Sequence, residues 1–430
     1  MTVPPGPERE GRTVHNWAGN IEFEAARVHR PGTVEEARRI VAAAEQVKVL
    51  GSGHSFNRVA DTSGDLLVLD GLPRGAEVSA DRRTVTVSGS PRYAELAREL
   101  HARGLALANL ASLPHISVAG SCATGTHGSG NGLQGLAAAV TAMRLITADG
   151  ELLDVSREKD VDRFAGSVVA LGALGAVVGL TLAVEPAFEV AQWVYDDVPL
   201  DRIADRFDEV FGTAYSVSAF TDWGRDTASV WVKCRPDREG GAHPGARWLD
   251  GRLADGPRHP VPGLSPVHCT GQLGVPGPWH ERLPHFRPDF TPSAGEELQS
   301  ELLLPREAAA AAIAEMRALG PRIAPLLLTS EIRTVAADDL WLSPAYGRDS
   351  VAVHCTWRPV SDAVREAIAL IERELLPLGG RPHWGKLFGL APEAVGALYE
   401  RGGDFRRLMT ELDPRSAFRN DYVAAAFPRP

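Results

Sequence analysis

A short glycine-rich segment followed by a histidine is the part of this chain best suited to chemistry. The apolar run 47–50 stops at Gly51-Ser52-Gly53, and His54 follows at once. Glycines leave space beside the backbone and N–H groups free, so such a loop can hold an anion, while His54 presents an imidazole. Two interpretations compete: the start of a dinucleotide-binding Rossmann unit, and a flavin pyrophosphate loop whose histidine bonds covalently to the flavin.

The residues after the loop weaken the Rossmann interpretation. Asp70 ends a second apolar run at about the expected distance from the glycines, which supports it. Close packing of a helix on the strand needs Gly or Ala at the third glycine position, however, and this chain has Phe56 there. Turn residues crowd 61–65 and leave no room for a crossover helix, so the flavin interpretation is preferred.

A second stretch of small residues runs from Asn109 to Gly130 and carries almost no charge. Backbone N–H groups in such a loop can form a nest around a pyrophosphate. Two separated nests of this kind indicate a long dinucleotide cofactor. An ordinary surface loop is the weaker alternative, because each of the two loops also contains a histidine.

Polar residues alternate along two predicted strands late in the chain. Glu331 and Arg333 share one face of the first strand, because side chains two apart in a strand point the same way. His354 and Thr356 share a face of the second. If the strands are neighbours, one sheet face gathers a carboxylate, a guanidinium, an imidazole and a hydroxyl, which suits a hydroxyl-rich ligand. A solvated face with surface ion pairs is the alternative.

Lysine is rare in this chain, so its positions are informative. Only Lys48, Lys159, Lys233 and Lys386 occur, and arginine supplies the rest of the 45 basic residues. Lys386 lies in the apolar setting RPHWGKLF, and we expect it to be half-buried and to face a pocket. A lysine kept in an arginine-rich chain suggests a need for a compact ammonium with a tunable pKa.

Helices and strands that position these residues can be assigned from periodicity and capping signals. We predict strands at 21–26, 84–88, 326–334 and 350–357, and helices at 33–47, 93–103, 305–319 and 361–376. The apolar run 167–184 is long enough to span a membrane, but its glycines divide it into a helix end, a turn and a buried strand. Residues 235–292 form a long ordered excursion without an assigned function, and its scattered histidines lack metal-ligand spacing.

Length and composition are those of a soluble globular protein of two or three domains, with 430 residues, 44% hydrophobic and 23% charged. The net charge of −10 argues against a nucleic-acid partner. The N-terminal segment has no apolar signal region, so a cytoplasmic location is expected. The cysteines are far apart and form no C-x-x-C, which argues against paired metal ligation and favours reduced thiols.

The sequence resembles the flavoprotein oxidases of the vanillyl-alcohol oxidase type, and among them closely the bacterial alditol oxidases. The matching segments cover nearly the whole chain and include NWAGN, VLGSGHSFN, RYAELA, ASLPHISVAGS, ATGTHGSG, FTDW, GVPGPWHERLPHF, EIRTVAADDLWLSPAYGRD and HWGK. The resemblance implies an α+β protein with a two-lobed FAD-binding domain of the PCMH type over 1–186. It further implies a substrate domain on an antiparallel sheet over 187–400, and a return to the FAD domain over 401–430.

Site residues follow from the same resemblance. It implies that FAD is bound covalently through His54 and contacts Val49, Leu50, Gly51, Ser52, Gly53, Ser55, Ser112, Ser117, Gly120, Thr124, Gly125, Thr126, His127 and Val177. It also implies that a polyol is bound by Ser112, Glu331, Arg333, Thr356 and Lys386, with His354 nearby.

The expected reaction is oxidation of a terminal hydroxyl of xylitol or sorbitol, with hydride transfer to flavin N5 and release of hydrogen peroxide from O2. The hydroxyl proton must be removed, for which His354 or Lys386 would serve. A positive charge from Arg333 or Lys386 would stabilise the reduced flavin, and Glu331 would accept from neighbouring hydroxyls.

We expect polyol and O2 as partners, no nucleic acid, membrane or metal, and a monomer. An aldonolactone oxidase or dehydrogenase is the rival among enzymes, because its flavin domain has the same loops. A sugar-alcohol-binding flavoprotein without turnover is the rival outside enzymes.

Overall fold

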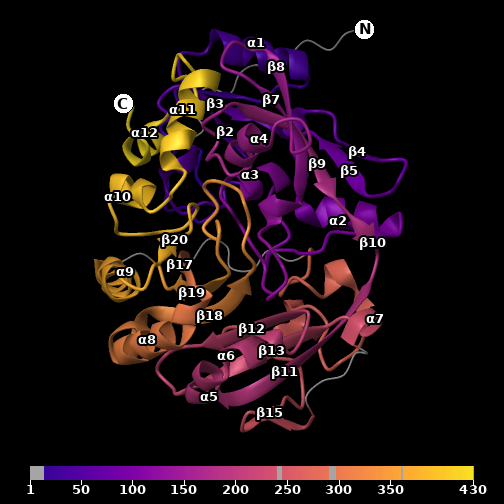
Figure 1. Cartoon of the computed structure of the whole chain (residues 1–430), viewed down its shortest axis with the longest axis vertical. Coiled ribbons are helices and arrows are strands. Elements are labelled where there is room, and N and C mark those ends of the chain that lie inside the picture. The colour runs from indigo at the N-terminus through magenta and orange to yellow at the C-terminus, as the bar shows by residue number, and fades with distance from the viewer. Residues whose placement is uncertain (1–13, 240–244, 290–296, 360–361, 430) are drawn as a thin grey trace.

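The computed structural model describes residues 14–239, 245–289, 297–359 and 362–429. Figure 1 shows the early part of the chain above, the large sheet formed by the middle of the chain below it, and the C-terminal helices in yellow back beside the N-terminal part. This α+β arrangement agrees with the predicted fold class.

The early part of the chain holds a small parallel sheet and a larger antiparallel sheet. The parallel sheet has the order β1 (Arg27–His29), β3 (Asp65–Val68), β2 (Val47–Leu50). The antiparallel sheet has the order β4 (Gly75–Val78), β5 (Thr84–Ser88), β9 (Ala176–Ala183), β7 (Val140–Ile146), β8 (Leu152–Ser156). A short antiparallel pair, β6 (Leu105–Ala106) and β10 (Glu185–Pro186), lies apart from them.

The first predicted strand and helix are placed differently in the structure. The strand is β1 at Arg27–His29 rather than 21–26, because the Asp65 carboxylate at the neighbouring strand binds both Arg27 and His29. Helix α1 runs over Val34–Ala43, with Thr33 as the predicted N-cap, and ends short of 47. Its end is set by β2, which begins at Val47 and must stay extended to pair with β3.

A large antiparallel sheet forms the second half of the structure. Its order is β14 (Arg247–Trp248), β15 (Gly251–Leu253), β11 (Glu189–Pro199), β13 (Thr227–Cys234), β12 (Ser216–Thr221), β18 (Leu327–Val335), β19 (Ser350–Trp357), β17 (Leu298–Pro305), β20 (Arg381–Pro382), and β16 (Gly277–Pro278) pairs with β11. The two predicted polar strands, β18 and β19, are neighbours, and Glu331 lies directly opposite His354. The condition on which the sequence argument depended is therefore met.

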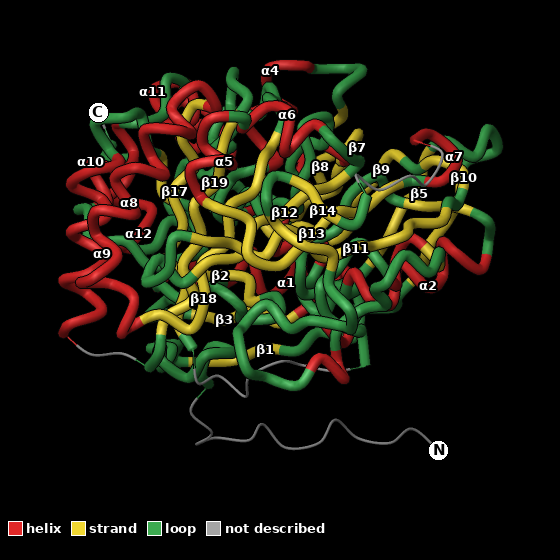
Figure 2. The backbone as a smooth tube through the Cα atoms, turned by 90° about the horizontal axis from the view of Figure 1, so that it is seen from below, coloured by secondary structure: helices red, strands yellow, loops and turns green. Residues whose placement is uncertain are grey.

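Helices cover one face of this sheet and leave the other to the polar residues. Ile332, Val353 and Cys355 belong to one apolar cluster with residues of α5 (Leu200–Asp205), α6 (Phe207–Gly212), α8 (Ala309–Ile323) and α9 (Asp362–Leu375). Figure 2 shows α8 and α9 in red beside the yellow strands. Because side chains alternate along a strand, Glu331 and Arg333 point to the opposite face.

Two helices near this face were predicted to start at 305 and 361. Pro305 ends β17, opposite Ser350, and a 3-10 turn at Arg306–Ala308 precedes α8, so the predicted start at 305 is wrong. Pairing with β19 holds Pro305 in the sheet, although proline is well suited to a first helical turn. The predicted cap at Ser361 lies outside the described residues, and α9 begins at Asp362.

Further helices close the early part of the chain. They are α2 (Tyr93–Ala102), α3 (Val118–Ala123), α4 (Val161–Val168), α10 (Pro392–Ala397), α11 (Gly402–Leu412) and α12 (Asp421–Ala426), with α7 (Pro236–Glu239) beside β11. The run 167–184 contains the end of α4 and strand β9, as predicted. Within the described ranges, no helix is both long and apolar enough to cross a membrane.

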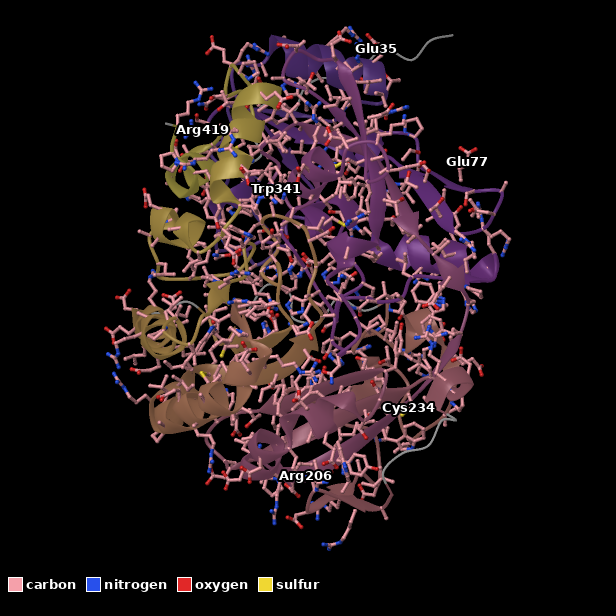
Figure 3. The ribbon with its side chains drawn as sticks, viewed as in Figure 1. Glu35, Glu77, Arg206, Cys234, Trp341 and Arg419 are labelled. Atoms are coloured by element: carbon pink, nitrogen blue, oxygen red, sulfur yellow. The ribbon has the colours of Figure 1, made fainter. Side chains whose placement is uncertain are left out.

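The C-terminal segment returns to the N-terminal sheet. Helix α11 packs on α4, and α12 packs on the 3-10 turn Arg58–Ala60. Trp341, labelled in Figure 3 beneath these helices, is buried, and the Arg401 guanidinium lies 4.3 Å from its ring centre. The Val47 amide donates to the Ala417 carbonyl at 2.7 Å, so the tail lies directly against β2 and the glycine loop that follows it.

Candidate active site

A cavity of about 430 Å³ lies between the early loops and the polar face of the large sheet. It is lined by the predicted residues Val49, Leu50, Gly51, Ser52, Gly53, His54, Ser55, Ser112, Ser117, Gly120, Thr124, Thr126, His127, Val177, Glu331, Arg333, His354, Thr356 and Lys386. Gly125 does not line it. That glycine has φ +71°, and an added Cβ would lie 2.8 Å from Pro344, so its place is explained by backbone conformation and packing.

The two small-residue loops meet at one end of the cavity. The Ser52 amide donates to Ser117 Oγ at 3.3 Å, and the Ser117 amide donates to Ser52 Oγ at 3.2 Å. A Cβ on Gly51 would lie 2.3 Å from Ser117 Oγ, and one on Gly120 would lie 2.7 Å from it. A side chain at either position would force the Ser117 hydroxyl to move, so the two glycines allow this close approach and leave a cradle lined by backbone.

His54 lies partly buried at the cavity wall, and its Nε2 atom is buried without a hydrogen-bond partner. Its ring stacks on Trp17, with the ring centres 4.2 Å apart. Burial, with a smaller contribution from nearby His115, lowers the pKa of His54 to about 3. The imidazole is therefore neutral at physiological pH, with a free nitrogen lone pair.

The polar end of the cavity is built by neighbouring strands and one loop. Glu331 and Arg333 come from β18, and His354 and Thr356 from β19. Lys386 follows β20, and its side chain is 13% exposed. The structure therefore brings these five predicted side chains together. The interpretation of a solvated sheet face is wrong, because the four residues on the strands are buried.

Glu301 is one residue of this site that was not predicted from the sequence. It lies on β17 opposite His354, with its side chain fully buried. Its carboxylate accepts from Arg333 Nη2 at 2.5 Å and from Lys386 Nζ at 2.5 Å. A charged residue directly before the apolar run 302–304 was a signal that could have identified it.

Charge pairing keeps both buried carboxylates ionised. Burial alone would raise the pKa of Glu301, but Lys386 and Arg333 hold it well below its usual range. The pKa of Glu331 is likewise lowered, because Arg333 and His285 outweigh its burial. Burial lowers the pKa of Lys386 from 10.5, against the opposing effect of Glu301. The site thus holds its charges as paired groups rather than as isolated ions.

The proton on His354 can be placed from its two neighbours. Lys386 Nζ lies 2.9 Å from Nδ1, and Thr356 Oγ1 lies 3.0 Å from Nε2. An ammonium group only donates, so Nδ1 accepts from charged Lys386 and Nε2 carries the hydrogen. Burial holds the pKa of His354 well below 6.5, so the ring is neutral. In this state His354 is a donor toward Thr356.

His285 is a second residue that the sequence argument did not place at the site. It comes from the excursion 235–292, lines the cavity, and bonds to Glu331. The sequence contained no signal for it, because its partner lies 46 residues further along the chain. Among the described residues, no three His, Cys, Asp or Glu side chains are grouped to hold a metal ion.

Comparisons with known proteins agree with this geometry. A family model described as an FAD binding domain matches residues 25–156, and one described as D-arabinono-1,4-lactone oxidase matches residues 297–426. Alditol oxidase from a Streptomyces species is 50% identical over 414 residues, which cover 95% of this chain and 98% of that protein. L-gulono-1,4-lactone dehydrogenase from Mycobacterium tuberculosis is 29% identical over 429 residues, covering 95% and 97%.

Among solved structures, cholesterol oxidase from B. sterolicum superimposes with a TM-score of 0.78 at 16% identity, covering 99% of this chain and 100% of that one. At this identity the match establishes the fold alone. Fold, loops and family models define the class as FAD-dependent oxidoreductases of the vanillyl-alcohol oxidase type. Within that class, the chain belongs to the alditol oxidase family. The predicted fold class, family and FAD cofactor are confirmed.

Proposed function

We propose that this protein is an FAD-dependent alditol oxidase that oxidises a terminal hydroxyl of polyols such as xylitol and sorbitol to the aldose. The observation that carries the proposal is the cavity itself. One end of the cavity is the glycine cradle, and the other end is a buried face of paired carboxylates, cations and hydroxyls. A neutral, hydroxyl-rich substrate can satisfy such a face, whereas a plain alcohol would leave its polar groups unpaired.

The residues present fit FAD. The cradle at Gly51, Ser117 and Gly120 leaves room for a pyrophosphate against the backbone, and His54 offers an unpartnered nitrogen. When bound, FAD supplies the oxidation by accepting a hydride from the substrate carbon, and its reoxidation by O2 yields hydrogen peroxide. The remaining predicted contacts in the two loops are proposed to hold it there.

We infer that His54 binds the flavin covalently. Its neutral ring and free Nε2 support this, because only an unprotonated imidazole nitrogen can form the bond. Protein precipitated with acid is expected to stay yellow, and His54→Ala protein is expected to release its colour into the supernatant. Complete release from the unmodified protein would contradict covalent attachment.

His354 and Lys386 act together in the proposed proton transfer. His354 Nε2 can take the hydroxyl proton only when Nδ1 carries the ring hydrogen, and that requires a neutral amine on Lys386 to accept from Nδ1. Glu301 keeps the amine in place by accepting another of its hydrogens. Arg333 contributes a fixed positive charge, and Glu331 and Thr356 bind further hydroxyls of the polyol.

Release of hydrogen peroxide across a panel of polyols tests the function. Xylitol and sorbitol are expected to give peroxide under air, and simple primary alcohols are expected to react at least 100-fold more slowly, on the order expected for unpaired buried groups. Without air, xylitol should bleach the flavin absorbance, and air should restore it. Binding of xylitol without bleaching would identify a polyol-binding flavoprotein instead.

Oxidation of an aldonolactone is the second candidate, because the family model over 297–426 is named for a lactone oxidase. The lactone relative is 29% identical, against 50% for the alditol oxidase. A γ-lactone turned over faster than xylitol would favour this candidate. We also propose that the chain divides into an FAD-binding part at 1–186, a substrate part at 187–400 and a return to the first part at 401–430. We further propose that the protein is a monomer, which sedimentation velocity of the purified protein would test.

A further inference from the structure

Lys233, His285 and Glu331 form a buried chain of contacts, and the first two residues have no role in the reaction proposed above. His285 Nε2 lies 3.0 Å from Glu331 Oε1, and His285 Nδ1 lies 3.4 Å from Lys233 Nζ. All three residues are buried. The chain runs from β13, through the excursion, to the strand that carries Glu331.

The direction of this chain is fixed by the carboxylate at its end. Ionised Glu331 can only accept, so Nε2 of His285 carries the ring hydrogen and donates it. Nδ1 then has only its lone pair, and Lys233 is the donor that faces it. Burial lowers the pKa of Lys233 to about 7, against the effects of Glu331 and Cys269, but charged and neutral forms both carry an N–H.

Packing leaves the His285 ring little freedom. Phe220 and Trp231 meet it edge-to-face, with ring centres 5.1 and 5.3 Å away. The His285 amide donates to the Ser112 carbonyl at 3.2 Å, and Lys233 Nζ also donates to the Leu283 carbonyl. The ring is thus held by a backbone hydrogen bond, by the two aromatic rings beside it and by a polar partner at each of its nitrogens.

We propose that Lys233 and His285 are positioning residues that set the orientation of Glu331 for polyol binding. With Oε1 bound to His285, Oε2 of Glu331 lies 3.5 Å from Arg333 Nε and remains available to a substrate hydroxyl. Without Lys233, Nδ1 of His285 is a buried acceptor that has lost its donor. The ring then loses one of the contacts that hold it against Glu331, and the carboxylate loses its fixed orientation. This inference rests on the polyol oxidase function proposed above.

Lys233→Met tests the proposal, because methionine fills the space of the lysine stem and cannot donate. In the FAD-loaded enzyme, KM for xylitol is expected to rise about tenfold or more while kcat changes less than threefold, since Glu331 binds hydroxyls without receiving the proton. In a Glu331→Ala background, Lys233→Met should add no further change, because the two residues act as one unit.

Thr270→Val is the matched control. Thr270 Oγ1 donates to the Pro284 carbonyl at 2.7 Å and lies 3.4 Å from the His285 carbonyl, so its loss removes buried bonds to the backbone and leaves both ring nitrogens of His285 with their partners. It should lower Tm and leave KM unchanged. An equal rise of KM in Thr270→Val, or a full additional effect of Lys233→Met in Glu331→Ala, would overturn the proposal.

The effect on KM, with and without Glu331→Ala, can also be compared for His285, the middle residue of the chain of contacts. If Lys233→Met does not fold, His285→Phe with and without Glu331→Ala gives the same two outcomes. Failure of this inference is distinct from failure of the proposed function. Unmodified enzyme that oxidises no polyol refutes the function, whereas normal xylitol turnover with an unchanged KM in Lys233→Met refutes only the positioning role.

Discussion

The protonation state of Lys386 decides what His354 can do. Charged Lys386 donates to Nδ1 and makes His354 a donor, while a neutral amine allows the ring to act as a base. Lys386 is bonded to Glu301 and His354, and it interacts electrostatically with Arg333, Glu331 and His383. The reactive state is therefore reached by removing a proton from this group.

We predict that kcat/KM for xylitol rises with pH through the pKa of Lys386, which burial places below its usual 10.5. Because the required form is deprotonated, the rate should rise about tenfold per pH unit below that pKa and level off above it. Lys386→Met should abolish this rise of kcat/KM with pH, and Lys159→Met, a substitution on the surface, should preserve it. A profile that falls over the same range would contradict the assignment.

Glu301→Gln tests the carboxylate that binds both cations. The substitution keeps the shape and removes the charge, which leaves Arg333 and Lys386 repelling each other in a buried site. We expect kcat/KM to fall on the order of 100-fold. Ser300→Ala changes the neighbouring residue on the other face of β17 and should lower kcat/KM less than threefold. Equal losses of kcat/KM in the two variants would argue for general disruption of the strand.

Alternation of side chains along single strands predicted part of the polar site. It places Glu331 and Arg333 on one face of their strand, and His354 and Thr356 on one face of theirs. Glu301 and His285 could not be found in this way. Their roles depend on which strands become neighbours and where a long excursion folds back, and neither is encoded in local spacing.

The loop that carries Lys386 is held by elements from both halves of the molecule. Asn57 Nδ2, just after the glycine loop, donates to the carbonyls of Trp384 and Lys386, each at 2.8 Å. Glu372 of α9 accepts from the Gly389 amide at 2.8 Å. Hydrogen bonds thus join the loop that carries Lys386 both to the segment after the glycine loop and to α9.

Glu372 makes this joint sensitive to pH. Burial raises the pKa of Glu372 to about 7, above its usual 4.5. The contribution of Glu372 to the free energy of unfolding is therefore fully present below pH 4.5. About 3 kcal/mol of it is lost as the pH rises to 7. Glu372→Gln should become more stable relative to the unmodified protein across that range. Thermal unfolding at pH 5 and pH 8 checks this, and Glu366→Gln, exposed on the same helix, should show no such trend.

Predicted elements were most accurate where one signal dominated. The alternating strand 84–88 and the strand 350–357 have the predicted bounds. Helix α1 and the start of α8 differ because pairing with a distant strand overrode local preference at Val47 and Pro305. Tertiary pairing thus sets the ends of elements whose existence is visible in the sequence.

At the scale of the whole molecule, the C-terminal tail completes the cofactor end. Phe418 is fully buried among residues of α1, β2 and β9, and its carbonyl accepts from Lys48 Nζ at 3.4 Å. Asp413 accepts from the amides of Ala417 and Phe418 and fixes this turn. The tail is thus part of the core beneath the glycine loop.

Phe418→Ala should therefore destabilise the protein by about 3–5 kcal/mol, the usual loss for a buried phenylalanine. Urea unfolding, followed by intrinsic fluorescence, measures it. Val161→Ala, at a position 58% exposed, should cost under about 0.5 kcal/mol. A small loss for Phe418→Ala would mean that the tail can detach without disturbing the core.

Burial of lysine has a practical consequence for handling the enzyme. All four lysines lie in the described ranges, and only Lys159, between β8 and α4, is exposed and absent from the cavity wall. Among the lysines, Lys159 should therefore be the one that amine-reactive dyes, biotin esters or activated beads modify in the native protein, and Lys386 should be spared. Coupling at Lys159, which does not line the cavity, should leave the enzyme active.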